Sequence, residues 1–340
     1  MEYVIGIDLG TSAVKLLLVN RLGSVVQEVS KPYPLIQEKS GYIEQDPEDW
    51  VRQTIAGITE LIDTFKEEPG SIKGISFSGQ MHGLVLLDEN HEVLRNAILW
   101  NDTRTTAQCE EIYQVIGKEK LVSMTQNLAL EGFTLPKLLW IKKHEAEIYR
   151  QVHTFLLPKD YVRYRLTGKI QMDYSDAAGT LLLDVKEKQW SKTICDLLQI
   201  DPTMCPPLVD SFEFVGNILP SIASQTGLSS EIKVFAGGAD NACGAIGAGI
   251  IEEGKILCSI GTSGVVLSFE ATCEQENDGK VHFFNHSVPN AYYSMGVTLA
   301  AGYSLSWFKD IFAPNETFEQ LLSEVITVPV GSNGLLFTPY

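Results

Sequence analysis

The chain has 340 residues, which is long enough for two domains and a sizeable core. Its composition is ordinary for a globular protein, with 44% hydrophobic residues, 20% charged residues and a mean hydropathy of +0.03. The formal net charge of −17 and the lack of a basic stretch argue against a nucleic-acid partner. No apolar run approaches the ~20 residues of a membrane span, which argues against a membrane partner.

Six cysteines are spread along the sequence without a C-x-x-C pair, at positions 109, 195, 205, 243, 258 and 273. This spacing predicts neither a disulfide framework nor a cysteine metal site. Glu2 stands where a signal peptide would carry positive charge. We therefore expect a cytoplasmic protein with reduced thiols.

The first ninety residues have an α/β pattern. Residues 3–30 predict a meander of three strands. A helix then starts at Asp46, the expected N-cap, with Pro47 at its first helical position. Two short apolar strands follow, at 72–78 and 84–87. This order of elements predicts a sheet with both antiparallel and parallel pairing.

The middle of the chain is richer in helix. Helices are expected at 105–117, 134–148 and 158–167. Residues 171–200 and the proline-rich stretch 202–207 have the pattern of surface excursions.

A second α/β unit begins late in the sequence. A strand at 234–236 leads into a glycine-rich turn and a helix of small residues at 242–251. A second strand meander then starts, and an apolar strand is expected at 334–338. We place the boundary so that residues 1–251 form the first domain and residues 252–340 the start of the second.

The tripeptide Gly-Thr-Ser occurs twice, each time at the bend between two apolar strand-like runs. Such a bend offers closely spaced backbone N–H groups and two hydroxyls in a concave turn, which suits phosphate oxygens. One copy is a weak signal, but two copies on either side of the glycine-rich segment 237–241 predict two related lobes that grip one nucleotide. The expected phosphate-binding residues are Gly10, Thr11, Ser12, Gly261, Thr262 and Ser263.

Two charged residues flank the first of these turns. Asp8 lies at the end of the preceding strand, where its carboxylate could hold Mg²⁺ through water while the turn binds phosphate. Lys15, just beyond the turn, is a further candidate for nucleotide binding. The alternative for Asp8 is a capping residue in an ordinary hairpin.

Asp240 follows the glycine-rich turn and begins the helix of small residues. The flanking glycines would let a substrate approach, and an ionised Asp can accept the proton of an attacking hydroxyl late in phosphoryl transfer. We therefore expect Asp240 to be a catalytic base. The alternative is an acid that only caps the positive end of its helix.

Two further loops carry side chains that suit a sugar. The loop Ser-Gly-Gln-Met-His-Gly follows a strand, at the sheet edge where α/β proteins bind ligands. The segment Trp-Asn-Asp-Thr-Arg combines an aromatic face, a carboxylate and a guanidinium group. A structural histidine and a structural Asp–Arg pair are the alternatives. The candidate sugar-binding residues are Gln80, Met81, His82, Trp100, Asp102 and Arg104.

With these motifs the sequence resembles the FGGY family of carbohydrate kinases, within the actin–hexokinase–Hsp70 superfamily, over essentially its whole length. The likeness includes both phosphate motifs, the first connecting motif and the first family signature. The Met-His form of the sugar loop is similar to that of members acting on xylulose. The segments that carry the resemblance are 5–15, 78–83, 132–144, 174–180, 237–249 and 257–266.

The resemblance implies an actin/hexokinase-like α/β fold, related to ribonuclease H, with two domains on mixed five-stranded sheets. It implies ATP-dependent phosphorylation of D-xylulose to D-xylulose 5-phosphate with Mg²⁺. Asp240 would then be the general base and Asp8 the Mg²⁺-linked carboxylate. The sugar contacts would be Met81, His82, Asp240 and Asn241. The family's adenosine motif is not found before Tyr340, so we expect an incomplete second domain and little activity from this chain alone.

Other functions stay open at this point. Another family member would act on gluconate, ribulose or glycerol, against which the Met-His loop argues. A chaperone-like ATPase or a filament subunit of the same superfold would leave that loop without a purpose. A sugar-sensing repressor would need a DNA-binding module and a less acidic chain. The oligomeric state is also open, with a homodimer as one candidate.

Overall fold

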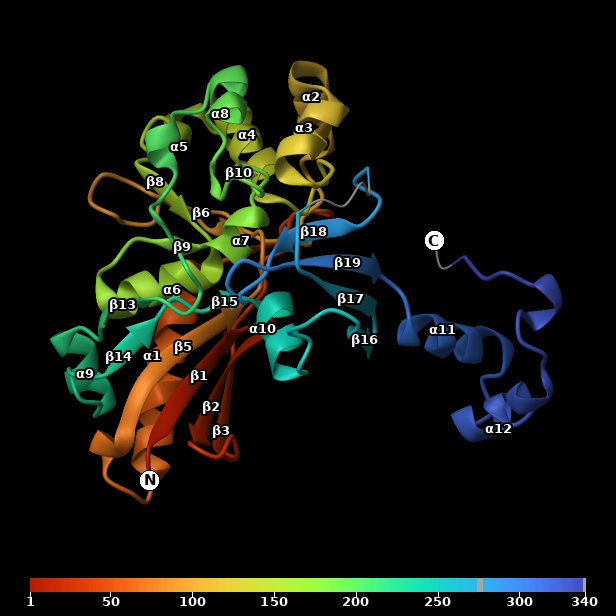
Figure 1. The fold of residues 1–340 in the computed structure, drawn as a ribbon, viewed down its shortest axis with the longest axis horizontal. Helices are drawn as coiled ribbons and strands as arrows, with labels where there is room; N and C mark the ends of the chain where they lie inside the picture. The colour runs from red at the N-terminus through yellow and green to blue at the C-terminus, as the bar shows by residue number, and fades with distance from the viewer. Residues whose placement is uncertain (274–277, 339–340) are drawn as a thin grey trace.

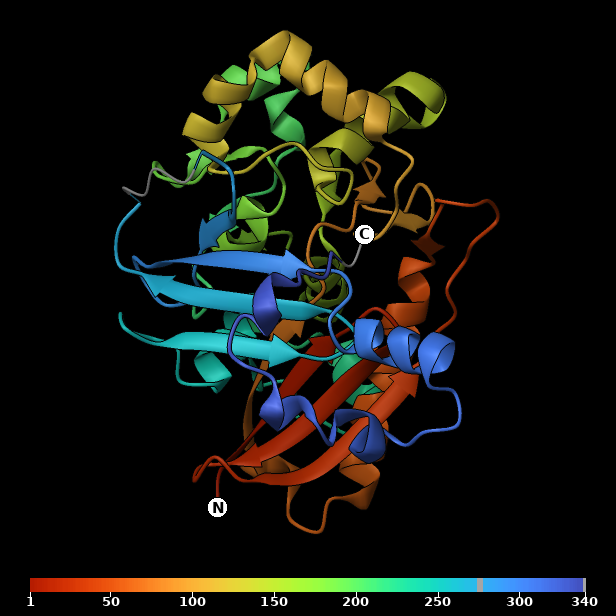
Figure 2. The ribbon, with the colours of Figure 1, turned by 90° about the vertical axis from the view of Figure 1, so that its right-hand side faces the viewer.

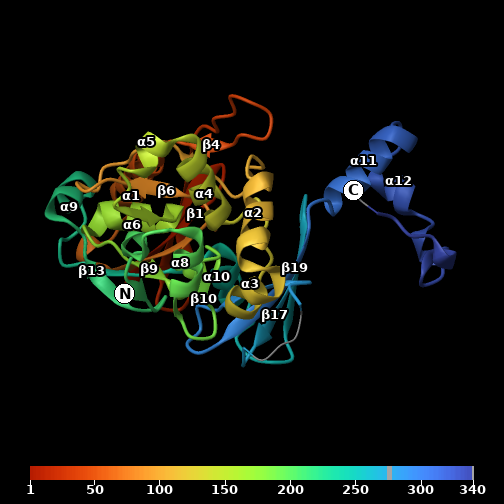
Figure 3. The same ribbon diagram turned by 90° about the horizontal axis from the view of Figure 1, so that it is seen from above.

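The computed structural model describes residues 1–273 and 278–338 and contains two main sheets with helices around them (Figure 1). A helical layer lies above the first sheet in this view, and the second sheet lies to the side. The C-terminal helices α11 (Gly302–Phe312) and α12 (Phe318–Leu322) extend away from this body, as the view from above shows (Figure 3). Within the described ranges, no helix combines the length and the apolar character that crossing a membrane requires.

The first sheet has seven strands in the described part of the chain. These are β1 (Tyr3–Leu9), β2 (Ala13–Asn20), β3 (Val25–Pro32), β5 (Ile72–Gly79), β13 (Phe214–Asn217), β14 (Lys233–Phe235) and β15 (Gly238–Ala239). Their order is β13-β14-β5-β1-β2-β3, and β15 also pairs with β5. Pairing is antiparallel within β1, β2 and β3 and parallel between β5 and its neighbours β1 and β14. The predicted mixed sheet is therefore confirmed.

One long helix, α1 (Pro47–Thr64), packs on β2 and β3. It begins as the sequence predicts, because the Asp46 side chain accepts a hydrogen bond from the Glu48 N–H and Pro47 occupies the first turn. Trp50 and Ile58 are fully buried on its inner face. The helices α6 (Pro158–Thr167) and α9 (Pro220–Thr226) pack against α1 and complete this layer.

The upper layer consists of short helices joined by two-stranded ribbons. Its helices are α2 (Thr106–Ile116), α3 (Lys118–Thr125), α4 (Thr134–His144), α5 (Ala146–Tyr149) and α8 (Lys192–Leu198). The short strands are β4 (Glu44–Gln45), β6 (Val85–Leu87), β7 (Ala97–Ile98), β8 (Thr154–Leu156), β9 (Met172–Asp173), β10 (Leu183–Asp184), β11 (Gln189–Trp190) and β12 (Leu208–Val209). The 3-10 turns are Pro69–Ser71, Pro202–Met204, Val325–Thr327 and Ser332–Gly334.

Three expectations about these elements are wrong. Residues 171–200 are not a surface excursion: they contain the short helix α7 (Tyr174–Ala178) and belong to the core. Their apolar residues are too irregularly spaced to give a periodic signal, and tertiary packing buries them. The expected helix 134–148 breaks at Glu145, whose backbone is not helical (φ −130°, ψ 51°). Residues 334–338 pair with no strand of the described chain and form no strand themselves.

The second sheet is antiparallel, and it crosses in front of the first sheet in Figure 2. Its strands are β16 (Ile256–Ile260), β17 (Gly264–Glu270), β18 (His282–Asn285) and β19 (Tyr292–Thr298), in the order β16-β17-β19-β18. Buried Phe284 and Tyr293 of this sheet share one core with Met81, which lies in the loop after β5 of the first sheet. The actin/hexokinase-like fold class is confirmed by the solved structures described below, although the two sheets have seven and four described strands, not five each.

The glycine-rich turn lies between the two sheets. It leads into α10 (Asp240–Gly247), which contacts β15 and β5. The expected domain boundary, after residue 251, falls in the link between α10 and β16. The ends of β5, β15 and β17 therefore gather the sequence motifs around one space.

Candidate active site

A cavity of about 530 Å³ lies where the two sheets face each other. It brings together six residues that the sequence singles out: Met81, His82, Trp100, Asp240, Asn241 and Ser263. The rest of its wall is apolar or aromatic, apart from one histidine, and comes from the loop before α4 and from the second sheet: Leu130, Gly132, Phe133, Val265, His282, Met295, Val297 and Leu299. An apolar wall with a few converging polar groups is the usual form of a small-molecule site.

Asp240 is placed in this cavity by a turn that only glycine can form. Gly237 has φ +73°, and a Cβ at this position would lie 2.1 Å from the Phe77 carbonyl oxygen. A Cβ on Gly238 would lie 2.1 Å from Ser287 Oγ. The turn therefore runs directly against β5, and Asp240 begins α10 at the cavity wall.

The Asp240 carboxyl group has an unusual environment. Burial raises its pKa to about 7, and the nearby charge of Asp8 acts in the same direction. The backbone N–H and the side-chain amide of Asn241 donate to Asp240 Oδ1 at 2.7 and 2.9 Å, which opposes part of this shift. A carboxyl group with a pKa near the working pH is well suited to general-base catalysis.

The sugar loop holds His82 in a defined orientation and tautomer. Its backbone is left-handed (φ +68°), and its Nδ1 lies 2.6 Å from the Gly179 carbonyl oxygen. Burial lowers the pKa of His82 to about 3, so the ring is neutral. Since a carbonyl oxygen only accepts, Nδ1 carries the proton and Nε2 is left as an acceptor. Neutral imidazole with a free acceptor is suited to a sugar hydroxyl.

One residue that stabilises this loop was not among the candidates predicted from the sequence. Lys137 is fully buried on α4, and its Nζ donates to the carbonyl oxygen of His82 at 3.0 Å and to that of Gly132. Thr134 Oγ1 donates to the same His82 oxygen at 3.1 Å. Lys137 lies inside the family signature 132–144, which was the available signal. His282 and Met295 had no such signal, because they reach the cavity from strands of the second sheet.

The first Gly-Thr-Ser turn connects β1 and β2, and its backbone is held by two amide side chains. Gln80 Nε2 donates to the Gly10 carbonyl at 3.3 Å, and Gln45 Nε2 donates to the Thr11 carbonyl at 2.7 Å. Trp50 Nε1 donates in turn to Gln45 Oε1 at 3.0 Å. Gln80, a candidate sugar contact, is 2% exposed and is not part of the cavity wall. The structure places its amide against the backbone of the first Gly-Thr-Ser turn.

The charged residues beside this turn lie on adjacent strands. Asp8 of β1 is exposed and stands directly opposite Lys15 of β2. Lys15 Nζ lies 3.4 Å from Glu28 Oε1 on the same sheet. Asp8 is close enough to Asp240 for its charge to affect the pKa of that group. The first turn and the catalytic candidate thus share one electrostatic environment.

The second Gly-Thr-Ser turn connects β16 and β17. Gly261 N donates to the Ser263 carbonyl at 2.8 Å, and the Gly261 and Thr262 carbonyls accept from Gly302 N and Ala301 N, each at 2.8 Å. Ser263 lines the cavity, so this turn reaches the same cavity wall as Asp240. Of the six predicted phosphate-binding residues, only Ser263 lines this cavity, and the binding of a nucleotide by both turns stays a prediction.

Asp102 and Arg104 do not line the cavity. The Arg104 guanidinium forms a bidentate pair with the Asp102 carboxylate and lies 3.9 Å over the Tyr42 ring. Asp102 Oδ2 also accepts from the Ile43 N–H at 2.6 Å, and Arg104 lies 2.7 Å from Glu44. These buried contacts fasten the loop that carries Trp100, which is the structural role considered as the alternative.

The donor groups at this site fit a Mg²⁺–nucleotide. An exposed carboxylate, Asp8, is the hard oxygen ligand that Mg²⁺ prefers, and the hydroxyl-bearing residues Thr11 and Ser12 of the first turn follow its strand. A second acidic group, formed by the carboxyl groups of Asp160, Asp173 and Asp176, lies within the core. The Lys159 ammonium group occupies its centre, so it does not suit a metal ion.

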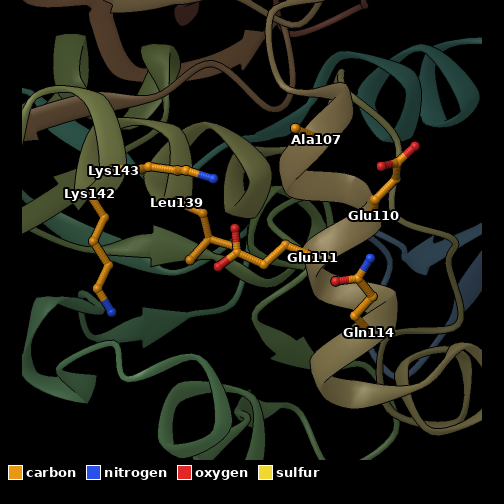
Figure 4. A pocket seen from close by; sticks show the side chains of 7 residues that line it. All are labelled: Ala107, Glu110, Glu111, Gln114, Leu139, Lys142 and Lys143. Atoms are coloured by element: carbon orange, nitrogen blue, oxygen red, sulfur yellow. The ribbon is translucent and has the colours of Figure 1, made fainter.

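A different cavity, of about 520 Å³, lies on the surface between α2 and α4 (Figure 4). Its wall is formed mainly by charged side chains that include Glu110, Glu111, Lys142 and Lys143. It contains none of the candidate site residues, so we assign the site to the cavity between the sheets.

The fold and this cavity define a class of protein. Two facing sheets, each with a Gly-Thr-Ser hairpin, and a carboxylate between them make a phosphotransferase of the actin/hexokinase-like type. The family model "FGGY family of carbohydrate kinases, N-terminal domain" matches residues 3–247. The chain belongs to the FGGY family of carbohydrate kinases.

Individual relatives are more specific. The chain is 62% identical over 340 residues to xylulose kinase of Bacillus subtilis, covering 100% of this chain and 68% of that protein. Among solved structures, xylulose kinase from Rhodospirillum rubrum superposes with a TM-score of 0.94 at 29% identity, over 100% of this chain and 70% of the other. Gluconate kinase from Lactobacillus acidophilus gives 0.93 at 28%, over 100% and 68%. The chain thus spans about two-thirds of the length of these relatives.

Proposed function

We propose that the cavity binds D-xylulose and that the protein transfers the γ-phosphoryl group of ATP to its terminal hydroxyl, giving D-xylulose 5-phosphate. The observation that carries this proposal is the meeting of Met81, His82, Asn241 and Asp240 in one cavity, which Ser263 of the second Gly-Thr-Ser turn also lines. The 62% identity to a protein named xylulose kinase supports the same sugar.

Asp240 has the position and the environment of a general base. Its carboxylate would accept the proton of the attacking hydroxyl at Oδ2, because Oδ1 accepts two hydrogen bonds from Asn241. The apolar walls exclude water and strengthen this interaction. Positioning of the hydroxyl between Asp240 and Ser263 would orient it towards the phosphate turns.

The sugar-binding groups are divided between apolar and polar contacts. Met81 is 4% exposed and would pack on the carbon edge of the sugar. His82 Nε2 would accept a hydrogen bond from a sugar hydroxyl, as its tautomer requires. The Asn241 amide would contact a second hydroxyl. Its hydrogen bond to the Asp240 carboxylate holds it in place.

The phosphate groups would contact both hairpin turns. Backbone N–H groups and hydroxyls of Thr11, Ser12, Thr262 and Ser263 would bind them, and Lys15 would add positive charge. Asp8 would hold Mg²⁺, which supplies neutralisation of the developing phosphate charge. Residues 1–251 would act as the first kinase domain and residues 252–340 as part of the second. We further propose a cytoplasmic location and leave a homodimer as the assembly to test by sizing.

The charge of the cavity wall distinguishes a xylulose site from a gluconate site. The backbone fold does not, because the solved gluconate kinase is about as similar as the xylulose kinases. A gluconate carboxylate needs a cation. The described wall of the cavity contains no Lys or Arg, and its only charged group is Asp240. Lys137 is near, but its Nζ is committed to two backbone carbonyl groups. A neutral sugar therefore fits the site better than an anionic one.

Calorimetric titration with xylulose, ribulose, glycerol and gluconate tests the proposal. We expect a saturable heat with xylulose and at least tenfold weaker binding of gluconate, since an unpaired buried charge costs several kcal/mol. His82→Ala should abolish most of the xylulose heat, whereas Lys143→Ala, in the surface cavity of Figure 4, should leave it unchanged. Equal binding of gluconate and xylulose would contradict the proposed substrate.

A further inference from the structure

The short helix α7 and its C-cap contact two parts of the candidate site, the turn before Asp240 and the His82 ring. At one end, Ser175 Oγ accepts a hydrogen bond from the backbone N–H of Ala239 at 2.9 Å. Ala239 is the N-cap residue of α10 and directly precedes Asp240. Four residues after Ser175, the Gly179 carbonyl accepts from His82 Nδ1 at 2.6 Å. One short segment thus connects the turn that precedes Asp240 to the imidazole ring of His82.

These contacts leave little room for movement. A Cβ added to Gly238 would lie 3.1 Å from Ser175 Oγ, and a Cβ on Gly179 would lie 2.9 Å from His82 Nδ1. Ser175 is fully buried, and Ala239 has no exposed surface either. A displacement of α7 would therefore move the Asp240 turn and the His82 ring together.

A hydrogen-bond relay connects Ser175 to a buried cation. Asp173 Oδ2 accepts from Ser175 N at 2.9 Å, from Ser175 Oγ at 2.5 Å and from Ser211 Oγ at 2.7 Å. The other oxygen, Asp173 Oδ1, lies 3.0 Å from Lys159 Nζ. Lys159, on α6, is fully buried and lies 3.3 Å from Asp176 of α7 as well. The ammonium group therefore holds α7 at its N-cap and within its first turn.

The electrostatics of this cluster favour a fixed arrangement. Burial by itself raises the pKa of Asp173, but the Lys159 charge and the serine hydroxyls outweigh it and hold that pKa below its usual value. Burial raises the pKa of Asp176 well above its usual range. The raised pKa favours the neutral form of Asp176. The cations Lys159 and Arg163 therefore do not face three ionised carboxylates in the group Asp160, Asp173 and Asp176. Breaking one partner out of such a buried set is strongly unfavourable.

We propose that α7 is a positioning element that sets the Asp240 carboxylate and the His82 imidazole relative to each other, and that the buried Lys159–Asp173 pair fixes it in place. Ser175 is then a positioning residue that acts through Ala239. This inference rests on the proposed function, in which both groups contact the same sugar. It adds a structural role for a segment that touches neither sugar nor nucleotide.

The test compares two matched variants of the 340-residue chain. Ser175→Ala removes the acceptor of the Ala239 N–H. Ser191→Ala removes a similarly buried serine that caps α8 and contacts no part of the site. Thermal unfolding checks that both fold. Selectively labelled samples then report the Asp240 carboxyl ¹³C and the His82 ring ¹⁵N resonances, assigned with Asp240→Asn and His82→Gln.

We expect Ser175→Ala to shift both resonances and to weaken xylulose binding about tenfold, the effect of one lost buried hydrogen bond. Ser191→Ala should shift each resonance by less than about one tenth of the shift that Ser175→Ala causes. It should lower the stability of the fold by a similar amount. If Ser175→Ala does not fold, Ser211→Ala is the second variant, because it removes only the hydrogen bond from Ser211 to Asp173. We expect it to shift the same two resonances by a smaller amount. A variant that shifts only the Asp240 signal, or neither signal, overturns the inference. The spectra decide this even if xylulose does not bind, an outcome that would contradict the proposed function instead.

Discussion

The indole Nε1 of Trp100 donates a hydrogen bond to the hydroxyl of Thr11 at 3.0 Å. This contact joins a wall of the cavity between the sheets to the first Gly-Thr-Ser turn, because Trp100 lines the cavity and Thr11 lies at the centre of the turn. Trp100 is 40% exposed, so its ring is available to a ligand while its nitrogen is fixed. In the proposed function, the sugar and phosphate subsites therefore share the side chain of Trp100.

Replacement of Trp100 tests this link. Trp100→Phe keeps an aromatic face but removes the donor to Thr11, and we expect xylulose binding to weaken by about 1 kcal/mol, or roughly fivefold. Stability should change little, since the ring is partly exposed. Titration calorimetry and a thermal melt measure both quantities. Unchanged affinity would show that the hydrogen bond does not order the cavity wall.

The protonation of Asp240 gives a second prediction. Burial and the Asp8 charge raise the pKa of Asp240 to about 7. A base must be ionised, so activity should rise as the pH increases through 7 and level off above it. A ¹³C NMR titration should show the Asp240 inflection near pH 7, and Asp8→Asn should move it lower. An inflection at the ordinary value of ~4 in the unsubstituted chain would contradict the assigned environment.

The same pKa predicts how stability depends on pH. Because the folded-state pKa of Asp240 exceeds its unfolded value of ~3.9, the folded state binds the proton more tightly. This contribution is fully present below pH ~4 and is lost as the pH rises through about 7. Asp240→Asn should therefore raise the melting temperature at pH 8 by a few degrees, roughly 2–4 °C per kcal/mol. The gain should shrink at pH 5; an equal gain at both values would exclude this linkage.

The glycine turn before Asp240 gives a paired prediction. Gly238→Ala places a Cβ 2.1 Å from Ser287 Oγ and should cost about 1–3 kcal/mol and disturb Asp240. Gly244, within α10, has open space at its Cβ, and Gly244→Ala should stabilise the helix by about 0.5–1 kcal/mol. Denaturant unfolding compares the two. Similar effects of both substitutions would mean that the turn is not tightly packed.

The sequence could predict those parts of the fold whose signals are local. Asp46 and Pro47 specify the start of α1 by their own chemistry, and the Gly-Thr-Ser bends mark two hairpins without reference to other segments. Segment 171–200 was mispredicted because the burial of α7 depends on α6 and the second sheet, which no pattern in its own residues reveals. Its assignment as surface hid the element that contacts His82 and Ala239, the residue before Asp240.

The candidate site shows the same limit. Motifs identified Met81, His82 and Asp240 because glycines mark their loops. They did not distinguish residues that face the cavity from neighbours that support it, and Gln80 and Arg104 proved to be directed towards backbone and side-chain partners instead. His282 has no local signal at all, since only the packing of the second sheet brings it to the cavity.

Turnover of the Asp240→Asn variant measures whether Asp240 is the catalytic base. Asparagine keeps the shape of the side chain and its Oδ1 contacts but cannot accept the hydroxyl proton. With xylulose and ATP in an assay coupled to ADP release, we expect a kcat about 10²–10⁴-fold below that of the unsubstituted kinase, with xylulose affinity largely kept. A near-normal kcat in the Asp240→Asn variant would contradict Asp240 as the base and, with it, the proposed chemistry of this cavity.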